Sequence, residues 1–276
     1  MQKKVIENSC YVAGAGAFGV FLRWLQDQLA FNEAGLPDPS AFHVLLPLYI
    51  LVCAVVFRHF VKRYTKAGLA VPEEVHSAFR NEGRLYALLR WVIGGIMILG
   101  GIVLLMTTET DKYAGMLRVL SFAAMLAGAS FTAFTTLVNR EDSKPNLLCL
   151  LSFLPILLYA IWLIYCYRAN SINSVVWSYV VEVGTVIMAM VAFFRIAGFP
   201  FNAPKAERCL FDIMFAGMLC LLALADERYM GLHIIFFSSA LMFIFYSWVL
   251  ICNLQPVDKK APTPEEKAED DGFERL

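Results

Sequence analysis

Seven apolar stretches of about 20 residues each constrain this chain more than any other feature of its sequence. An α-helix rises about 1.5 Å per residue, so about 20 residues cross the roughly 30 Å hydrocarbon layer of a membrane. The stretches are Phe42–Phe60, Leu85–Met106, Met116–Val138, Leu147–Tyr167, Ile172–Ile196, Ala206–Ala225 and Met230–Cys252. The pattern predicts an all-α, polytopic integral membrane helix bundle.

The composition excludes two other classes of protein. Of the 276 residues, 59% are hydrophobic and 17% are charged, whereas a soluble domain is about 45–50% apolar and about 25% charged. So few charged residues cannot cover a soluble core of this size. Lys and Arg together number 23, the same as Asp and Glu, so the chain lacks the basic excess of a nucleic-acid-binding protein. We therefore expect a lipid bilayer, and no nucleic acid, as its surroundings.

An eighth span is predicted near the N-terminus. The apolar run from Cys10 to Leu22 is only 13 residues long and becomes long enough by including Arg23 and Asp27. These two residues are four positions apart, so they can form an ion pair on one helix face. We predict eight spans in a single domain, residues 1–255; the alternative is seven spans with an N-terminal helix lying at the membrane interface.

The distribution of Lys and Arg predicts the orientation. With eight spans and the N-terminus inside, 17 of these residues fall in cytoplasmic segments and four, Lys112, Arg118, Arg168 and Arg228, fall in outer segments. Cytoplasmic loops of membrane proteins carry such an excess. We therefore predict a plasma membrane of the bacterial type, with both termini in the cytoplasm.

Two cytoplasmic segments are candidates for a protein partner. Residues 58–84 form a basic loop, in which Pro72 is expected to open a short helix reaching Phe79, or alternatively a continuation of the following span. Residues 256–276 contain three prolines, seven acids and four bases, a composition that cannot bury enough apolar surface to fold alone. We predict a disordered cytoplasmic tail there.

Glu182 is the most informative ionisable residue, because a charge at the centre of a bilayer costs at least about 2.5–3.5 kcal/mol. If the sixth span begins at Ile172, Glu182 lies near the membrane midplane. Ser174, Ser178 and Thr185 fall on the same helix face by their spacing. We predict that this face points into the bundle as a binding site for a solute or proton.

Two buried ion pairs and one further polar stripe complete the predicted site. Thr132 and Thr135 lie on a small, polar stripe of the fourth span, which is a candidate partner for Glu182. Arg23 lies at a depth from which its long side chain can reach Glu182. Arg90 and Asp212 lie at matching depths near the inner surface, so they are expected to pair.

We predict neither a metal nor a cofactor. The seven cysteines form no CxxC pair and no cluster with histidine, and no catalytic arrangement is recognisable. Gly14, Gly16 and Gly19 match a nucleotide-binding glycine pattern, but they lie inside an apolar helix, where small residues serve close helix packing.

Two classes of function fit these features. The first is a transporter, or transport component, for a small solute or protons. The second is a non-transporting sensor or scaffold that engages a cytoplasmic partner through residues 58–84 and the tail. A membrane enzyme acting on lipid is a third, more distant alternative.

Overall fold

The computed structural model describes residues 2–31, 42–108, 112–140, 142–171 and 179–256. Its long helices are α1 (Gln2–Leu29), α2 (Phe42–Lys66), α4 (Arg84–Thr107), α5 (Ala114–Leu137), α6 (Pro145–Asn170), α7 (Val180–Ala197), α8 (Ala206–Leu222) and α9 (Met230–Cys252). The short elements are β1 (Leu69–Ala70), α3 (Val75–Ala78), the 3-10 helix η2 (Ala223–Ala225) and β2 (Gln255–Pro256). The predicted tail, residues 256–276, lies outside the described residues except for Pro256.

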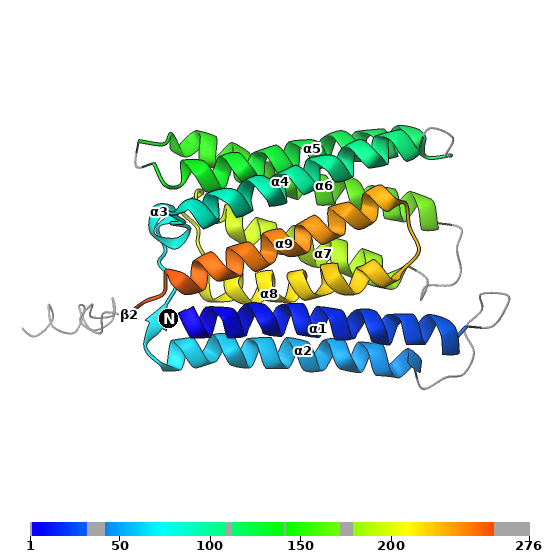
Figure 1. Cartoon of the computed structure of the whole chain (residues 1–276), viewed down its shortest axis with the longest axis horizontal. Coiled ribbons are helices and arrows are strands. Elements are labelled where there is room, and N and C mark those ends of the chain that lie inside the picture. Colours follow the sequence, from blue (N-terminus) through cyan, green and yellow to red (C-terminus); the bar gives the residue numbers. More distant parts are fainter. Residues whose placement is uncertain (1, 32–41, 109–111, 141, 172–178, 257–276) are drawn as a thin grey trace, which may run out of the picture.

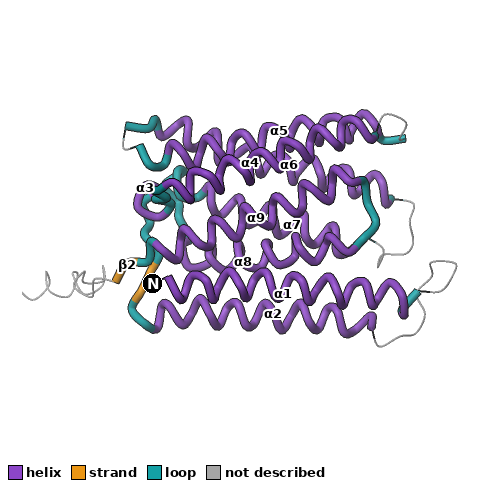
Figure 2. The backbone as a smooth tube through the Cα atoms, in the orientation of Figure 1, coloured by secondary structure: helices purple, strands orange, loops and turns teal. Residues whose placement is uncertain are grey.

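The long helices run side by side along one axis (Figures 1 and 2). Helices α1 and α2 form one edge of the bundle, and α4 and α5 form the opposite edge, with α9 and α8 between them. The chain reverses direction from each long helix to the next. We call the end where α1 begins and α9 ends the proximal end, and the opposite end the distal end.

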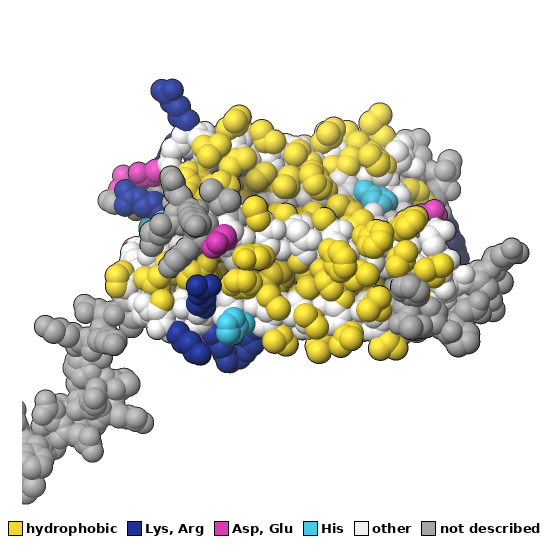
Figure 3. All heavy atoms as spheres, turned by 60° about the horizontal axis from the view of Figure 1, so that its bottom comes forward, with side chains coloured by type: hydrophobic (Ala, Val, Ile, Leu, Met, Phe, Trp, Pro, Cys, Tyr) yellow, Lys and Arg dark blue, Asp and Glu magenta, His cyan; other side chains and the backbone are white. Residues whose placement is uncertain are grey.

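Among the described residues, seven helices are long and apolar enough to cross a membrane, namely α2, α4, α5, α6, α7, α8 with η2, and α9. Their composition supports a multi-pass membrane protein. Large hydrophobic side chains remain exposed on the bundle surface, such as Val55 at 63% and Leu88 at 62%. Figure 3 shows hydrophobic side chains over the middle of one face, with most of the visible Lys and Arg toward one end. Such an apolar surface suits contact with lipid.

Helix α1 is not one of these seven apolar helices, but it lies alongside them in the bundle. It has 28 residues and packs along α8 and α2. A Cβ atom added at Gly16 would lie 2.5 Å from Leu221 Cδ1, and one added at Gly19 would lie 2.9 Å from Leu222 Cδ1. Only glycine permits this approach, so Gly16 and Gly19 serve packing, as predicted. A Cβ atom added at Gly14 would meet nothing within 4 Å, so the prediction is wrong for Gly14.

An aromatic core fills the middle of the bundle. The rings of Tyr159 and Trp162 stack at 6.1 Å between centroids, and Trp162 lies 4.2 Å from Phe236. Phe193 lies 4.7 Å from Phe243. All five side chains are at most 2% exposed. The large contact area of these rings holds α6, α7 and α9 together.

A cap made by residues 69–83 closes the proximal end. Strand β1 pairs antiparallel with β2, and α3 follows as a short helix separate from α4, as in the first of the two predictions. The helix begins at Val75 and not at Pro72, so the predicted start is wrong. Phe79, 1% exposed, packs against Phe134, Phe199 and Tyr246. The cap is therefore part of the core.

Candidate functional site: a charged network at the distal end

Four charged side chains form a continuous network at the distal end of the bundle. Arg23 Nε lies 2.6 Å from Asp226 Oδ1. Asp226 is also paired with Arg228, whose Nε lies 3.3 Å from Glu182 Oε2. Trp162 Nε1 donates a hydrogen bond of 2.8 Å to the other carboxylate oxygen of Glu182. The network thereby joins α1, α6, α7 and the connection that precedes α9.

The network is almost completely withdrawn from solvent. The exposed fractions of the side chains are 2% for Arg23, 7% for Asp226, 6% for Arg228 and 12% for Glu182. Charges are buried at a large desolvation cost, which is offset only when each is paired and hydrogen-bonded. Each member therefore depends on its neighbours for its place in the fold.

Further hydrogen bonds hold the connection between α8 and α9. Asp226 adopts an extended backbone directly after η2, and its carbonyl lies 2.9 Å from His233 Nε2. Arg228 donates to the carbonyl of Ala223. Arg23 also donates to Gln26 at 2.6 Å. The connection is thus tied to both of the helices that it joins and to α1.

Acidic groups outnumber basic ones here. Besides Asp226 and Glu182, Asp27 lies 3.7 Å from Arg23, and the exposed Glu227 adjoins the network. Four carboxylates therefore surround two arginines. Glu182 stands in the first turn of α7, where the helix dipole favours a negative charge. The distal end is accordingly suited to attract a positively charged group.

A cavity of 460 Å³ opens beside the network. Its lining residues come from α6, α7, α9 and the connection before α9: Tyr165, Ala169, Asn170, Glu182, Glu227, Arg228, Tyr229 and Leu232. On the proximal side of the network lies the aromatic core, because Phe236 packs 5.2 Å from the Arg228 guanidinium and 4.2 Å from Trp162. From the cavity toward the proximal end, the buried charges therefore come first and the packed aromatic rings follow.

The structure corrects the predicted surroundings of Glu182. Helix α7 begins at Val180, so Glu182 lies near the distal end of its helix, whereas we expected the midplane. Arg23 and Glu182 do belong to one network, but Asp226 and Arg228 stand between them. Ser174 and Ser178 lie outside the described residues.

Thr185 does not line the cavity. Its hydroxyl donates a hydrogen bond of 2.7 Å to the Val181 carbonyl, within its own helix, and lies 3.4 Å from the Leu219 carbonyl of α8. A threonine bonded back to its own helix in this way contributes to helix packing. Its predicted place beside Glu182 on a binding face is therefore not observed.

The polar stripe of α5 faces α4 and not α7. Helix α6 lies between α5 and α7. Thr132 donates to the carbonyls of Gly128 and Arg90 at 3.1 and 3.3 Å, and Thr135 donates to Phe131 at 2.7 Å. A Cβ atom added at Gly94 would collide with the Thr132 hydroxyl. The stripe lets two backbones approach closely, and a polar path shared with Glu182 is not formed.

The predicted ion pair between Arg90 and Asp212 is also corrected. Arg195 Nε lies 3.1 Å from Asp212 Oδ2, whereas Arg90 donates 2.9 Å to the Thr135 carbonyl. Helix α9 packs on both α4 and α8 and stands between them. A matching depth in the membrane was therefore not enough to predict the pair, because Arg90 and Asp212 face different helices.

Asp226, Arg228 and Trp162 are the members of the network that sequence reasoning missed. The sequence did contain a signal for two of them. Asp226 and Arg228 directly follow the apolar stretch Ala206–Ala225, at the end that the predicted topology places on the same side of the membrane as Arg23. From the sequence, Arg228 counted only toward the orientation. Within the described ranges, no three His, Cys, Asp or Glu residues form a cluster that could hold a metal ion.

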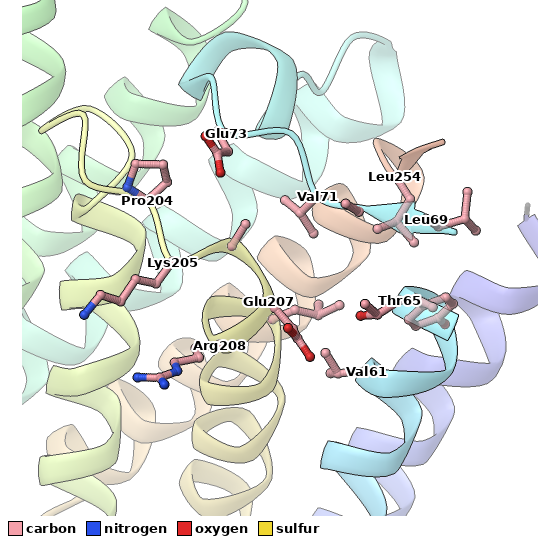
Figure 4. Close-up of a pocket in the computed structure, with 14 residues that line it drawn as sticks. Val61, Thr65, Leu69, Val71, Glu73, Pro204, Lys205, Glu207, Arg208 and Leu254 are labelled. Carbon is pink, nitrogen blue, oxygen red and sulfur yellow. The ribbon is translucent and has the colours of Figure 1, made fainter. Parts of the chain in front are cut away.

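A second cavity, of 530 Å³, lies at the proximal end between α2, β1 and α8 (Figure 4). Apolar residues such as Val61, Leu69 and Leu254 line it together with charged ones. Figure 4 shows the Glu207 carboxylate on the side of α2, whereas the ends of Lys205 and Arg208 point away from it. This cavity is therefore apolar and acidic on the side of α2.

Compared with known proteins, the chain matches no protein-family model, no curated protein and no solved structure. The chemistry of the two ends is the basis for inferring a function.

Proposed function

We propose that the chain is a bacterial-type plasma-membrane protein with eight spans, both termini in the cytoplasm and the distal end outside. The placement of α1 along the full bundle supports the eighth span, because Arg23, its costly residue, is paired with Asp226. The basic residues near the proximal end, Arg58, Lys62, Arg63, Lys66, Arg80 and Arg84 among them, support the orientation.

Cysteine labelling tests this topology. In a cysteine-free background, a membrane-impermeant maleimide added to intact cells should modify Glu227→Cys at the distal end. It should modify Arg80→Cys in the proximal cap only after the cells are opened. Labelling of Arg80→Cys in intact cells would show that the proximal end is outside and that the proposed orientation is wrong.

We further propose that the distal end binds a small solute carrying a positive charge, and that the protein acts as a receptor or sensor. The observation that carries this proposal is the cavity lined by Glu182 and Arg228, where carboxylates exceed arginines. A carboxylate has about four acceptor sites, so Glu182 retains capacity for an ammonium group beside Trp162 and Arg228. A cation bound there would alter a network that reaches four parts of the bundle.

Sensing is favoured over passage by the aromatic core. A solute leaving the cavity toward the proximal end would have to separate Trp162 from Phe236, and then Phe193 from Phe243. On this proposal the cytoplasmic readout is a protein partner engaged through residues 58–84 and the tail.

Transport is the second candidate, supported by the way the cavity ends on Glu182. In this mechanism, the same solute or a proton binds at Glu182, and a rearrangement of the aromatic core carries it across. The two candidates therefore share a binding site, and they differ in whether the bound solute returns to the outside or crosses the membrane.

Binding and flux measurements separate these possibilities. With the protein in lipid nanodiscs, titration with ethanolamine should raise the melting temperature. Glu182→Gln should weaken the interaction at least tenfold, which corresponds to about 1.4 kcal/mol. The matched control is Glu207→Gln, an acid lining the proximal cavity, which should leave binding unchanged.

Equal binding by the Glu182→Gln variant, or no binding by the natural chain, would overturn the site. Uptake of labelled ethanolamine into proteoliposomes, absent from empty liposomes, would overturn sensing and establish transport.

A further inference from the structure

An apolar groove adjoins the charged cavity at the distal end. It has a volume of 620 Å³ and lies between α6 and α7, lined by Leu163, Ile164, Cys166, Tyr167, Asn170, Ser171, Tyr179 and Val183. Ile164 is 55% exposed and Tyr167 is 76% exposed, so the groove is on the outer surface of the bundle. In a membrane, this surface faces the lipid.

The groove and the charged cavity are neighbours at the distal end. Asn170 of α6 lines both of them. On α7, the consecutive residues Glu182 and Val183 line the cavity and the groove respectively. A molecule that lies across Asn170 would therefore have its polar group on the side of Glu182 and its apolar chain on the side of Val183.

This combination selects an amphiphile over a water-soluble solute. A fully hydrophilic molecule would leave the groove unused, whereas the hydrocarbon chain of a membrane lipid matches its apolar lining. The headgroup must match the excess of carboxylates, so a cationic amine is favoured. An anionic headgroup without an amine would meet two carboxylates, Glu182 and Glu227, and only one arginine, Arg228, in the cavity lining.

We propose that the natural ligand is a lipid of the outer leaflet with a primary-amine headgroup, such as phosphatidylethanolamine. Its ammonium group lies between Glu182 and Glu227, and one acyl chain runs along the groove between α6 and α7. This inference rests on the proposed function and names the class of solute that the cavity takes.

The groove can be blocked without changing the charged cavity. Val183→Trp puts a large ring into the groove, whereas Val180→Trp puts the same ring on α7 at a residue that is 37% exposed and does not line the groove. The two variants are therefore matched in size and in helix, and they differ in whether the ring enters the groove.

Native mass spectrometry of the purified protein with added lipids tests the proposal. We expect phosphatidylethanolamine to be retained at least tenfold better than phosphatidylglycerol. Val183→Trp should lose that preference, and Val180→Trp should keep it. Glycerophosphoethanolamine, which has the same headgroup and no chains, should bind both variants equally.

The outcomes distinguish the two proposals. If soluble amines bind in a Glu182-dependent manner while phosphatidylethanolamine is not preferred, or survives in Val183→Trp, this inference is overturned and the proposed function stands. If neither the lipid nor the soluble amines depend on Glu182, both are overturned.

Discussion

The two ends of the bundle are closed by different chemistry. At the distal end, Arg23, Asp226, Arg228 and Glu182 are buried as charges, and each is held by at least one opposite charge. At the proximal end, the closing contact is the ring of Phe79 among three other aromatic rings. A charged closure depends on every partner being present, whereas an apolar closure depends mainly on filled volume.

This difference indicates where a ligand can act. A cation arriving at the distal end changes the electrostatic balance of groups that already hold α1, α6, α7 and α9. At the proximal end, the cap is held by aromatic packing and by neutral hydrogen bonds such as those of Asn139 and Asn253. On the proposed function, the distal end is therefore the one where a bound cation would change the charge balance.

The largest effect is expected from Asp226→Ala, because it removes the carboxylate that bridges Arg23 and Arg228. Removal of one partner from a buried ion pair costs about 3–5 kcal/mol, and we expect a loss in this range although Arg23 keeps Asp27 and Arg228 keeps Glu182. Unfolding by SDS titration in detergent micelles measures the loss. The control is Glu227→Ala, an exposed neighbour, for which a similar loss would contradict the charged closure.

Phe79→Ala should have the next largest effect, about 3 kcal/mol, because truncation of a buried phenylalanine leaves a cavity. The same SDS titration measures it. Phe201→Ala, a neighbouring phenylalanine that is 56% exposed, should cost much less. If both variants unfold alike, the cap does not seal the bundle.

Asp212→Asn probes a charged pair that is less deeply buried than the distal network. Arg195 is 22% exposed and Asp212 is 12% exposed, so a stranded Arg195 can turn toward water. We expect a loss of about 1–2 kcal/mol, between the values for exposed and fully buried pairs. The double variant Arg195→Asp with Asp212→Arg should recover part of it. A loss as large as that of Asp226→Ala would remove the distinction between the two ends.

Asn253→Ala should produce the smallest effect. Its side-chain amide donates to the carbonyls of Ala78 and Arg80 at 2.9 and 2.8 Å, and a neutral hydrogen bond contributes about 1 kcal/mol. Hydrogen exchange should show faster exchange in residues 75–83 while α9 stays protected. Unchanged exchange in the cap would mean that its other contacts, such as those of Phe79 and Asn81, retain it without Asn253.

Several features of the fold could be predicted from sequence because they are local. Runs of apolar residues fix the number and approximate position of the seven apolar helices, and Pro72 predicted a helix that the structure places at Val75–Ala78. The close packing of Gly16 and Gly19 also followed from small residues inside an apolar run. None of these inferences required knowledge of which helices are neighbours.

The candidate site was predictable only in part. Glu182 and Arg23 were identified because ionisable residues in apolar stretches are costly. The bridging residues Asp226 and Arg228 were missed because they lie in a short connection, where charges are ordinary. The beginning of α7 was placed eight residues too early, at Ile172 rather than Val180, which moved Glu182 to the wrong depth.

The sequence by itself determined that apolar helices form and how long most of them are, because hydrophobicity and helix geometry act over a few neighbouring residues. Only the tertiary structure decided which charges meet. Asp212 pairs with Arg195 and not with Arg90, because α9 lies between α4 and α8. The order of helices around the bundle, and the rotation of each about its axis, depend on packing summed over all interfaces, and no local pattern encodes that sum.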